Sequence, residues 1–194
     1  MTEFELYFGL GREHIMDIKA YDHILFVIAL CAIYQIQDWK RVLILITAFT
    51  IGHSLTLALA ALDIITANAA AIEFLIPLTI FITAAGNIKN AGKDFSQQKM
   101  PLNYFFALFF GLIHGLGFSN YLKSLLGSEA SVLTPLFSFN LGLELGQLLI
   151  VIMFFGLAFV VQVFIKAKKR DWIVIISSAV AGVAITLMID AKFW

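Results

Sequence analysis

The chain has 194 residues, of which 61% are hydrophobic and only 13% are charged. A soluble domain usually contains about 45–50% apolar residues, and a chain of this length cannot bury the excess in one core. The formal net charge is +0, so no excess of basic charge favours binding to nucleic acid. The single cysteine, Cys31, excludes an internal disulfide. The composition therefore predicts an integral membrane protein whose main partner is the lipid bilayer.

The first predicted element is a short helix over residues 1–20 that lies in the membrane interface. This segment mixes apolar residues with charged ones, a pattern typical of helices at the lipid–water boundary. It carries Glu3 and Glu5 and has no basic region before an apolar core, so we expect no cleavable signal peptide.

Six apolar segments follow and predict transmembrane helices, since one crossing needs roughly 20 apolar residues. They cover about 22–37, 42–62, 71–88, 102–122, 133–165 and 172–190. The first is short for a crossing, and the fifth is long enough to tilt or to protrude from the membrane. The sequence thus predicts an all-α polytopic bundle in which residues 1–194 form a single transmembrane domain.

The lysines and arginines predict the orientation of this bundle. Nine of the 13 fall in three alternating connections, at 38–41, 89–100 and 166–171. Cytoplasmic connections of membrane proteins are enriched in these residues, so we expect both termini outside the cytoplasm. Trp39 and Trp172 lie at the predicted cytoplasmic boundary, where amphipathic rings are common.

Polar and ionisable side chains interrupt the apolar segments. Every histidine lies in or beside such a segment: His14, His23, His53 and His114. Asp22 precedes the second histidine, and the fifth span contains the run FNLGLELGQ. Ionisable groups at membrane depth are energetically costly, and they therefore indicate a functional site.

Helical geometry places the polar residues of the fifth span on one face. At 100° per residue, Asn140, Glu144 and Gln147 fall close together, and Gly142 and Gly146 fall on roughly the opposite face. A GxxxG pair allows another helix to pack closely. We therefore expect the polar face to point towards the histidines and the glycine face to contact a helix.

The second and fourth predicted spans carry one histidine each. His53 shares a polar stripe with Thr47, Thr50 and Ser54. His53 lies about 18 Å from the predicted cytoplasmic end of its helix, just beyond the middle of a ~30 Å hydrocarbon core, and the fourth-span histidine is placed similarly. The glycines at 111 and 115 bracket that histidine and would let a neighbouring backbone approach it. We expect the site in the outer half of the membrane.

The convergence of imidazoles and carboxylates at one level predicts a metal site. This donor set suits Zn, Ni, Co, Cu or Fe. The predicted ligands are His14, Asp22, His23, His53, His114 and Glu144. The predicted supporting residues are Asp17, Thr50, Ser54, Glu73, Asn140 and Gln147.

Several alternatives stay open for these residues. His14 and Asp17 lie one helical turn apart, so a second ion is an alternative to a single one. Asp22 also suits a helix N-cap, and Glu73 suits the start of a helix, where its charge complements the dipole. Asn140 and Gln147 also suit interhelical hydrogen bonds.

Five motifs, in order, resemble the HupE/UreJ family of bacterial membrane proteins. They are HI…DHILF, FTIGHSLTL, EFLIPLTIFITAAGN, FGLIHGLGF and FNLGLELGQ, and they lie within residues 10–150. The resemblance implies a nickel or cobalt permease in the cytoplasmic membrane of a bacterium, associated with hydrogenase and urease maturation. It places the family's motif positions on His14, Asp22, His23, His53, Ser54, Thr56, Glu73, Asn87, His114, Asn140, Glu144 and Gln147.

Two functions are compatible with such a site. In the favoured one, transport, the ion is captured on the outer side and released inward, which requires weak onward sites. The inner halves of the second and fourth spans, VLILI and YFFALFF, offer almost none. The residues left to line an inward route are Cys31, Gln35, Thr79, Thr83 and Asn87. The alternative is a membrane-embedded metalloenzyme or metal-storing accessory protein whose metal acts from the outer side.

Overall fold

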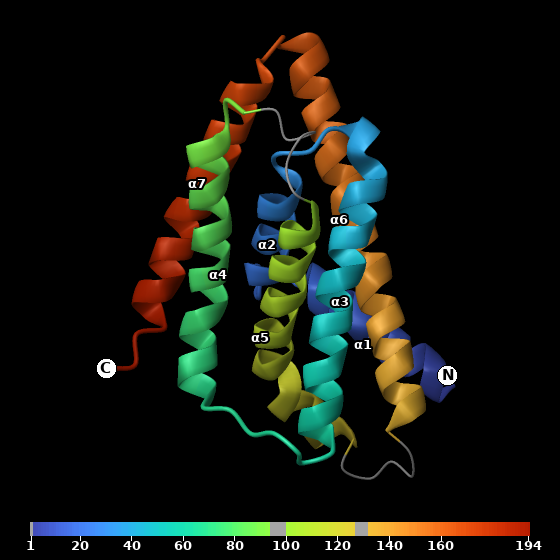
Figure 1. Cartoon of the computed structure of the whole chain (residues 1–194). Coiled ribbons are helices and arrows are strands. Elements are labelled where there is room, and N and C mark those ends of the chain that lie inside the picture. Colours follow the sequence, from blue (N-terminus) through green and yellow to red (C-terminus); the bar gives the residue numbers. More distant parts are fainter. Residues whose placement is uncertain (1, 94–99, 127–131) are drawn as a thin grey trace.

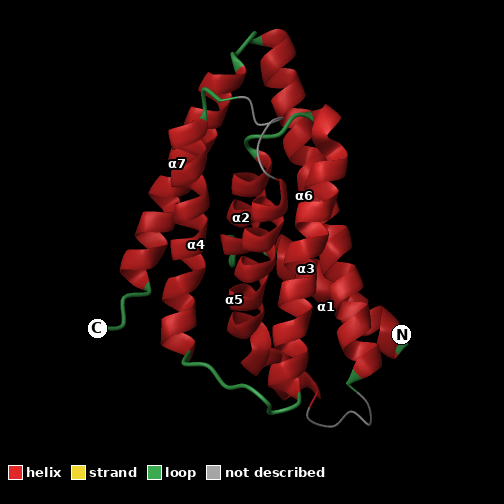
Figure 2. Cartoon of the chain, viewed as in Figure 1, coloured by secondary structure: helices red, strands yellow, loops and turns green. Residues whose placement is uncertain are grey.

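The computed structural model describes residues 2–93, 100–126 and 132–194. Every regular element in these ranges is a helix, which confirms the predicted all-α fold (Figures 1 and 2). The elements are α1 (Glu3–Met16), α2 (Asp22–Cys31), the 3-10 helix η1 (Ile36–Asp38), α3 (Trp39–Ala61), α4 (Ala69–Asn90), α5 (Met100–Leu126), α6 (Leu133–Phe164) and α7 (Lys169–Asp190). Among the described residues, the five helices α3 to α7 are long and apolar enough to cross a membrane.

The first predicted span, residues 22–37, is not one spanning helix. α2 has 10 residues, a rise of about 15 Å against a hydrocarbon core of ~30 Å. α1 and α2 in series carry the chain from the N-terminus towards the far end of the bundle (Figure 1). Between them, the Asp17 carboxylate accepts a hydrogen bond from the Lys19 backbone N–H at 2.8 Å, which stabilises a turn in place of a helix. The predicted first span is therefore a short helix, α2, followed by turns and η1.

α1 packs directly across α6, backbone against backbone. A Cβ atom at Gly11 would collide with the carbonyl oxygen of Phe139, and one at Gly142 would collide with that of Phe8. A Cβ atom at Gly146 would likewise meet a side chain of α1. The prediction that Gly142 and Gly146 contact another helix is confirmed, while the interfacial location of α1 stays a prediction.

α3 and α5 form a second pair of closely packed helices, with glycines on both partners. A Cβ atom at Gly111 would collide with the carbonyl oxygen of Phe49, and one at Gly115 with that of His53. Gly52 allows the same approach from the α3 side. The sequence predicted that the glycines beside His114 let a neighbouring backbone approach α5. That backbone belongs to α3.

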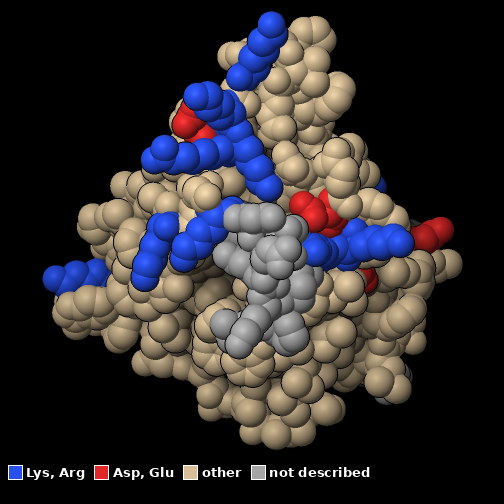
Figure 3. Space-filling model, turned by 45° about the horizontal axis from the view of Figure 1, so that its top comes forward, with Lys and Arg blue, Asp and Glu red and all other residues tan. Residues whose placement is uncertain are grey.

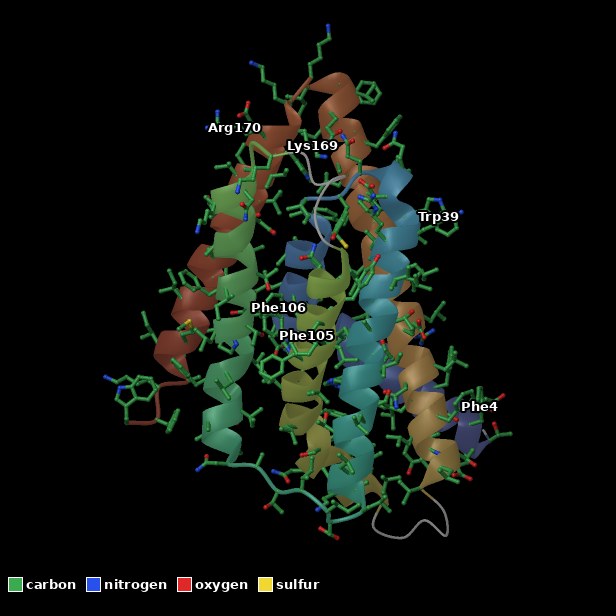
Figure 4. All side chains as sticks on the ribbon, in the orientation of Figure 1. Phe4, Trp39, Phe105, Phe106, Lys169 and Arg170 are labelled. Carbon is green, nitrogen blue, oxygen red and sulfur yellow. The ribbon has the colours of Figure 1, made fainter. Side chains whose placement is uncertain are left out.

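Most of the basic side chains of the described chain gather at one end of the bundle, here called the basic end (Figure 3). Trp39 lies near this end, below Lys169 and Arg170 (Figure 4). Both termini lie towards the opposite end (Figure 1). The predicted cytoplasmic connections, 38–41, 89–100 and 166–171, contribute eight described basic residues to this end: Lys40, Arg41, Lys89, Lys93, Lys166, Lys168, Lys169 and Arg170.

Candidate metal centre

Three histidines from three helices converge within the bundle. His14 lies in the last turn of α1, His23 is the second residue of α2, and His53 lies within α3. One ligand atom from each lies within 4.8 Å of the other two, so the three can share one metal ion. The ring centroids of His14 and His23 are 4.6 Å apart, and those of His23 and His53 are 6.2 Å apart. We call this group the histidine triad.

The fourth histidine, His114 of α5, lies beside the triad. Its ring centroid is 5.3 Å from that of His23, and its side chain is fully buried. His53 and His114 are each the fourteenth residue after the first residue of their helices, which places both about 21 Å from the helix ends nearest the basic end. The sequence prediction that these two histidines share a depth agrees with these helix bounds.

The imidazole nitrogens of the centre are buried, and several have no hydrogen-bond partner. These are Nε2 of His14, His23 and His114 and both nitrogens of His53, counted against the described residues. Buried polar atoms are rarely left unpaired, because each one costs roughly 1–3 kcal/mol. A cluster of unpaired imidazole nitrogens is typical of a ligand-binding site.

Two of the histidines have their tautomers set by acceptors. The Nδ1 atom of His23 lies 3.1 Å from a carboxylate oxygen of Asp22, and the Nδ1 atom of His114 lies 2.9 Å from the carbonyl oxygen of Phe110. Because an ionised carboxylate and a carbonyl only accept, Nδ1 must carry the proton in both rings. Nε2 then presents a lone pair, which is the form that a metal ion binds.

Phenylalanine rings surround the centre, and sequence reasoning missed them. The ring centroid of Phe118 is 3.9 Å from that of His14, and that of Phe139 is 5.7 Å from it. Because the chain contains 19 phenylalanines, no single one stands out. The available signal was a spacing of three or four residues from a histidine, shared by Phe26, Phe49 and Phe110.

Two cavities beside the centre are lined by residues that carry carboxylates. One of about 1130 Å³ is lined by His14 and Asp17, together with other residues of α1 and of the turn that follows it. Another of about 350 Å³ is lined by Asp22, Glu73 and Asp190. Asp17 and Glu73, which were predicted as supporting residues, therefore lie on these cavities and outside the triad.

A family model described as HupE / UreJ protein matches residues 1–191. The chain belongs to the HupE/UreJ family. The match includes every helix and every residue of the metal centre, and it confirms the resemblance seen in the five motifs. The comparisons with curated proteins and with solved structures returned no match.

In this HupE/UreJ protein, two residues of the polar face of α6 contact threonines of α3, whereas the prediction placed this face towards the histidines. The Thr47 hydroxyl donates to a carboxylate oxygen of Glu144 at 2.7 Å, and the Thr50 hydroxyl donates to the amide oxygen of Gln147 at 2.9 Å. Thr47 precedes His53 by six residues, or about 9 Å along the helix. The structure thus joins Glu144 to the threonine stripe of α3 and does not bring it into the triad.

The other two supporting residues make local hydrogen bonds in this HupE/UreJ protein. The Ser54 hydroxyl donates to the carbonyl oxygen of Thr50 at 2.6 Å, within α3. The Asn140 amide nitrogen donates to the carbonyl oxygen of Leu136 at 2.7 Å, within α6. The amide oxygen of Asn140 is buried without a partner among the described residues, so it can accept a hydrogen bond from a ligand or coordinate a metal ion.

Proposed function

We propose that this HupE/UreJ protein is a permease for a divalent transition metal of the nickel or cobalt class. The observation that carries the proposal is the convergence of buried imidazole nitrogens that no described residue satisfies. The triad and His114 would bind the ion, and Asp22 would orient His23. Imidazole nitrogens match these borderline metals better than they match magnesium or calcium.

The ion would approach through the cavity that His14 lines. Carboxylates at Asp17 and Glu13 lie on the same cavity and would attract a cation before it loses water. His14 would then be the first imidazole that the ion meets, since the other triad members line none of the described cavities. In the orientation expected from the basic end, this entry lies outside the cytoplasm, and release occurs towards the basic end.

Metal binding and flux test the proposal with one substitution and one control. The wild-type chain, purified in detergent, should bind nickel stoichiometrically and carry it into liposomes. His53→Ala removes a central ligand and should lower the affinity by at least about 100-fold. Ser177→Ala is the control, because Ser177 is equally buried but lies on α7, outside the centre. Retention of the wild-type metal content by His53→Ala would show that the ion binds elsewhere.

A membrane metalloenzyme or metal-storing protein is the second candidate, and one observation favours it. The centre is bordered by fully buried phenylalanines, among them Phe26 and Phe49, which leave the ion no polar contact on that side. A protein that only stores or uses its metal would bind nickel tightly and would show no flux into liposomes. The same pair of measurements therefore separates the two candidates.

A further inference from the structure

A third cavity lies between the metal centre and the basic end. Its volume is about 280 Å³, and residues of α2, α3, α4 and α5 line it together with the segment after α2. Phe106, one of the lining residues, lies on α5 where that helix faces α4 (Figure 4). The polar side chains of the lining are Tyr34, Thr83, Asn87, Asn90 and Asn103, and no lining residue is charged. We call this space the asparagine cavity.

The hydrogen bonds of the asparagines leave their amide oxygens unused. The amide nitrogens of Asn87 and Asn90 donate to backbone carbonyl oxygens at 2.7 and 2.8 Å, and that of Asn103 donates to the Tyr34 hydroxyl at 3.3 Å. The three amide oxygens have no hydrogen-bond partner among the described residues. Asn87 is only 7% exposed, but its amide oxygen is not buried, so a water molecule or a ligand in the cavity can reach it.

Three phenylalanines separate this cavity from the metal centre. The ring centroid of Phe26 is 4.9 Å from that of Phe49 and 5.9 Å from that of Phe110. Phe110 lines the asparagine cavity, whereas Phe26 and Phe49 lie 5.0 and 5.1 Å from His114. The cavity and the metal centre therefore lie on opposite sides of one phenylalanine layer.

We propose that the asparagine cavity is a second cation site, which holds a divalent metal ion weakly and still partly hydrated. The inference rests on the proposed transport function, because a permeating ion needs an onward site from which it can leave. Neutral amide and hydroxyl oxygens attract a cation without the strong bonds that imidazole forms with nickel or cobalt. With no carboxylate in its lining, the cavity would bind the ion weakly and release it readily.

A single added charge tests this site. Asn103→Asp puts a carboxylate into the lining and keeps the contact with Tyr34, whose hydroxyl then donates to it. Asn68→Asp adds the same charge at the N-cap of α4, where the side chain already accepts from the Ala71 N–H and an aspartate serves equally well. Both substitutions are made in the His53→Ala protein, so that the strong centre does not mask the weak site.

The readout is nickel binding to the purified full chain by equilibrium dialysis and metal analysis. Asn103→Asp should bind nickel at least tenfold more tightly than Asn68→Asp does, and in the otherwise wild-type chain it should slow release from liposome-reconstituted protein. Asn90→Asp, on the opposite wall, should act in the same direction and provides a second variant should the first misfold. Equal nickel binding by all three variants would overturn the proposal.

The outcomes separate this inference from the proposed function. Flux by the wild-type chain without any gain of nickel binding in Asn103→Asp would support the permease function and contradict the second cation site. A gain of nickel binding in Asn103→Asp without flux by the wild-type chain would support the cation site and contradict the permease function.

Discussion

At the metal centre, no acceptor among the described residues sets the tautomers of His14 and His53. Acceptors hold the Nδ1 atoms of His23 and His114, but neither nitrogen of His53 has a partner among the described residues. Its ring lies nearly parallel to that of Phe139, at an interplanar angle of 11°. An arriving ion would thus meet two imidazoles of fixed tautomer, at His23 and His114, and two whose tautomer can follow the ion, at His14 and His53.

The contact between Asp22 and His23 leads to a prediction about affinity. Asp22→Asn keeps the shape of the side chain and removes the charge that holds the proton on Nδ1 of His23. Nickel affinity, measured by titration of the purified protein, should fall about 10- to 100-fold, as is usual when such a supporting partner is lost. Asp63→Asn is the matched control, since Asp63 pairs with Lys123 far along the chain from the centre. Equal affinities in the two variants would contradict the assigned role of Asp22.

The histidines could be identified from the sequence because an imidazole inside an apolar helix is conspicuous. The partner of Glu144 could not, because the register between α3 and α6 decides whether it meets Thr47 or His53, and only packing sets that register. Asn90 and Asn103 were overlooked because they lie near helix ends, where polar residues are ordinary. Thr83 and Asn87 were among the residues expected to line an inward route, and both line the asparagine cavity.

At the scale of the helices, glycines decide which pairs approach closely. α1 reaches α6 at Gly11 and Gly142, and α3 reaches α5 at Gly52, Gly111 and Gly115. Both contacts hold helices that carry histidines of the metal centre. The apolar segments of the sequence predicted the five long helices. The predicted span 22–37 continued beyond the end of α2, because the apolar residues that follow Cys31 form turns. Hydropathy alone does not distinguish apolar turns from apolar helix.

Two glycines of α6 offer a matched test of this packing. Gly142→Ala places a methyl group against the carbonyl oxygen of Phe8, whereas Gly156→Ala meets nothing within 4 Å. The first should lower the midpoint of thermal unfolding by several degrees and weaken nickel binding, because α1 carries His14. The second should leave both unchanged or slightly raise stability, since alanine favours helix over glycine. Similar melting curves for the two proteins would show that α1 tolerates displacement from α6.

At the scale of the whole molecule, the placement of basic residues predicts the topology. The lysines and arginines at the basic end should face the cytoplasm, and both termini, which lie towards the opposite end, should face outward (Figures 1 and 3). Fused after Trp194, a reporter that works only outside the cytoplasm should be active, and one that works only in the cytoplasm should be inactive. A reporter fused within residues 166–168 should show the reverse. Cytoplasmic activity at Trp194 would invert the direction of transport proposed above.

The break between α1 and α2 has a consequence for how the fold is held together. His14 and His23 belong to separate short helices, joined by a turn at residues 17–21. An ion bound by both histidines would link the end of α1 to the start of α2. At a hundred times its dissociation constant, an ion that only the folded state binds adds about 2.7 kcal/mol to stability. The bound ion would thus supply a link between α1 and α2 that the polypeptide provides only through the turn.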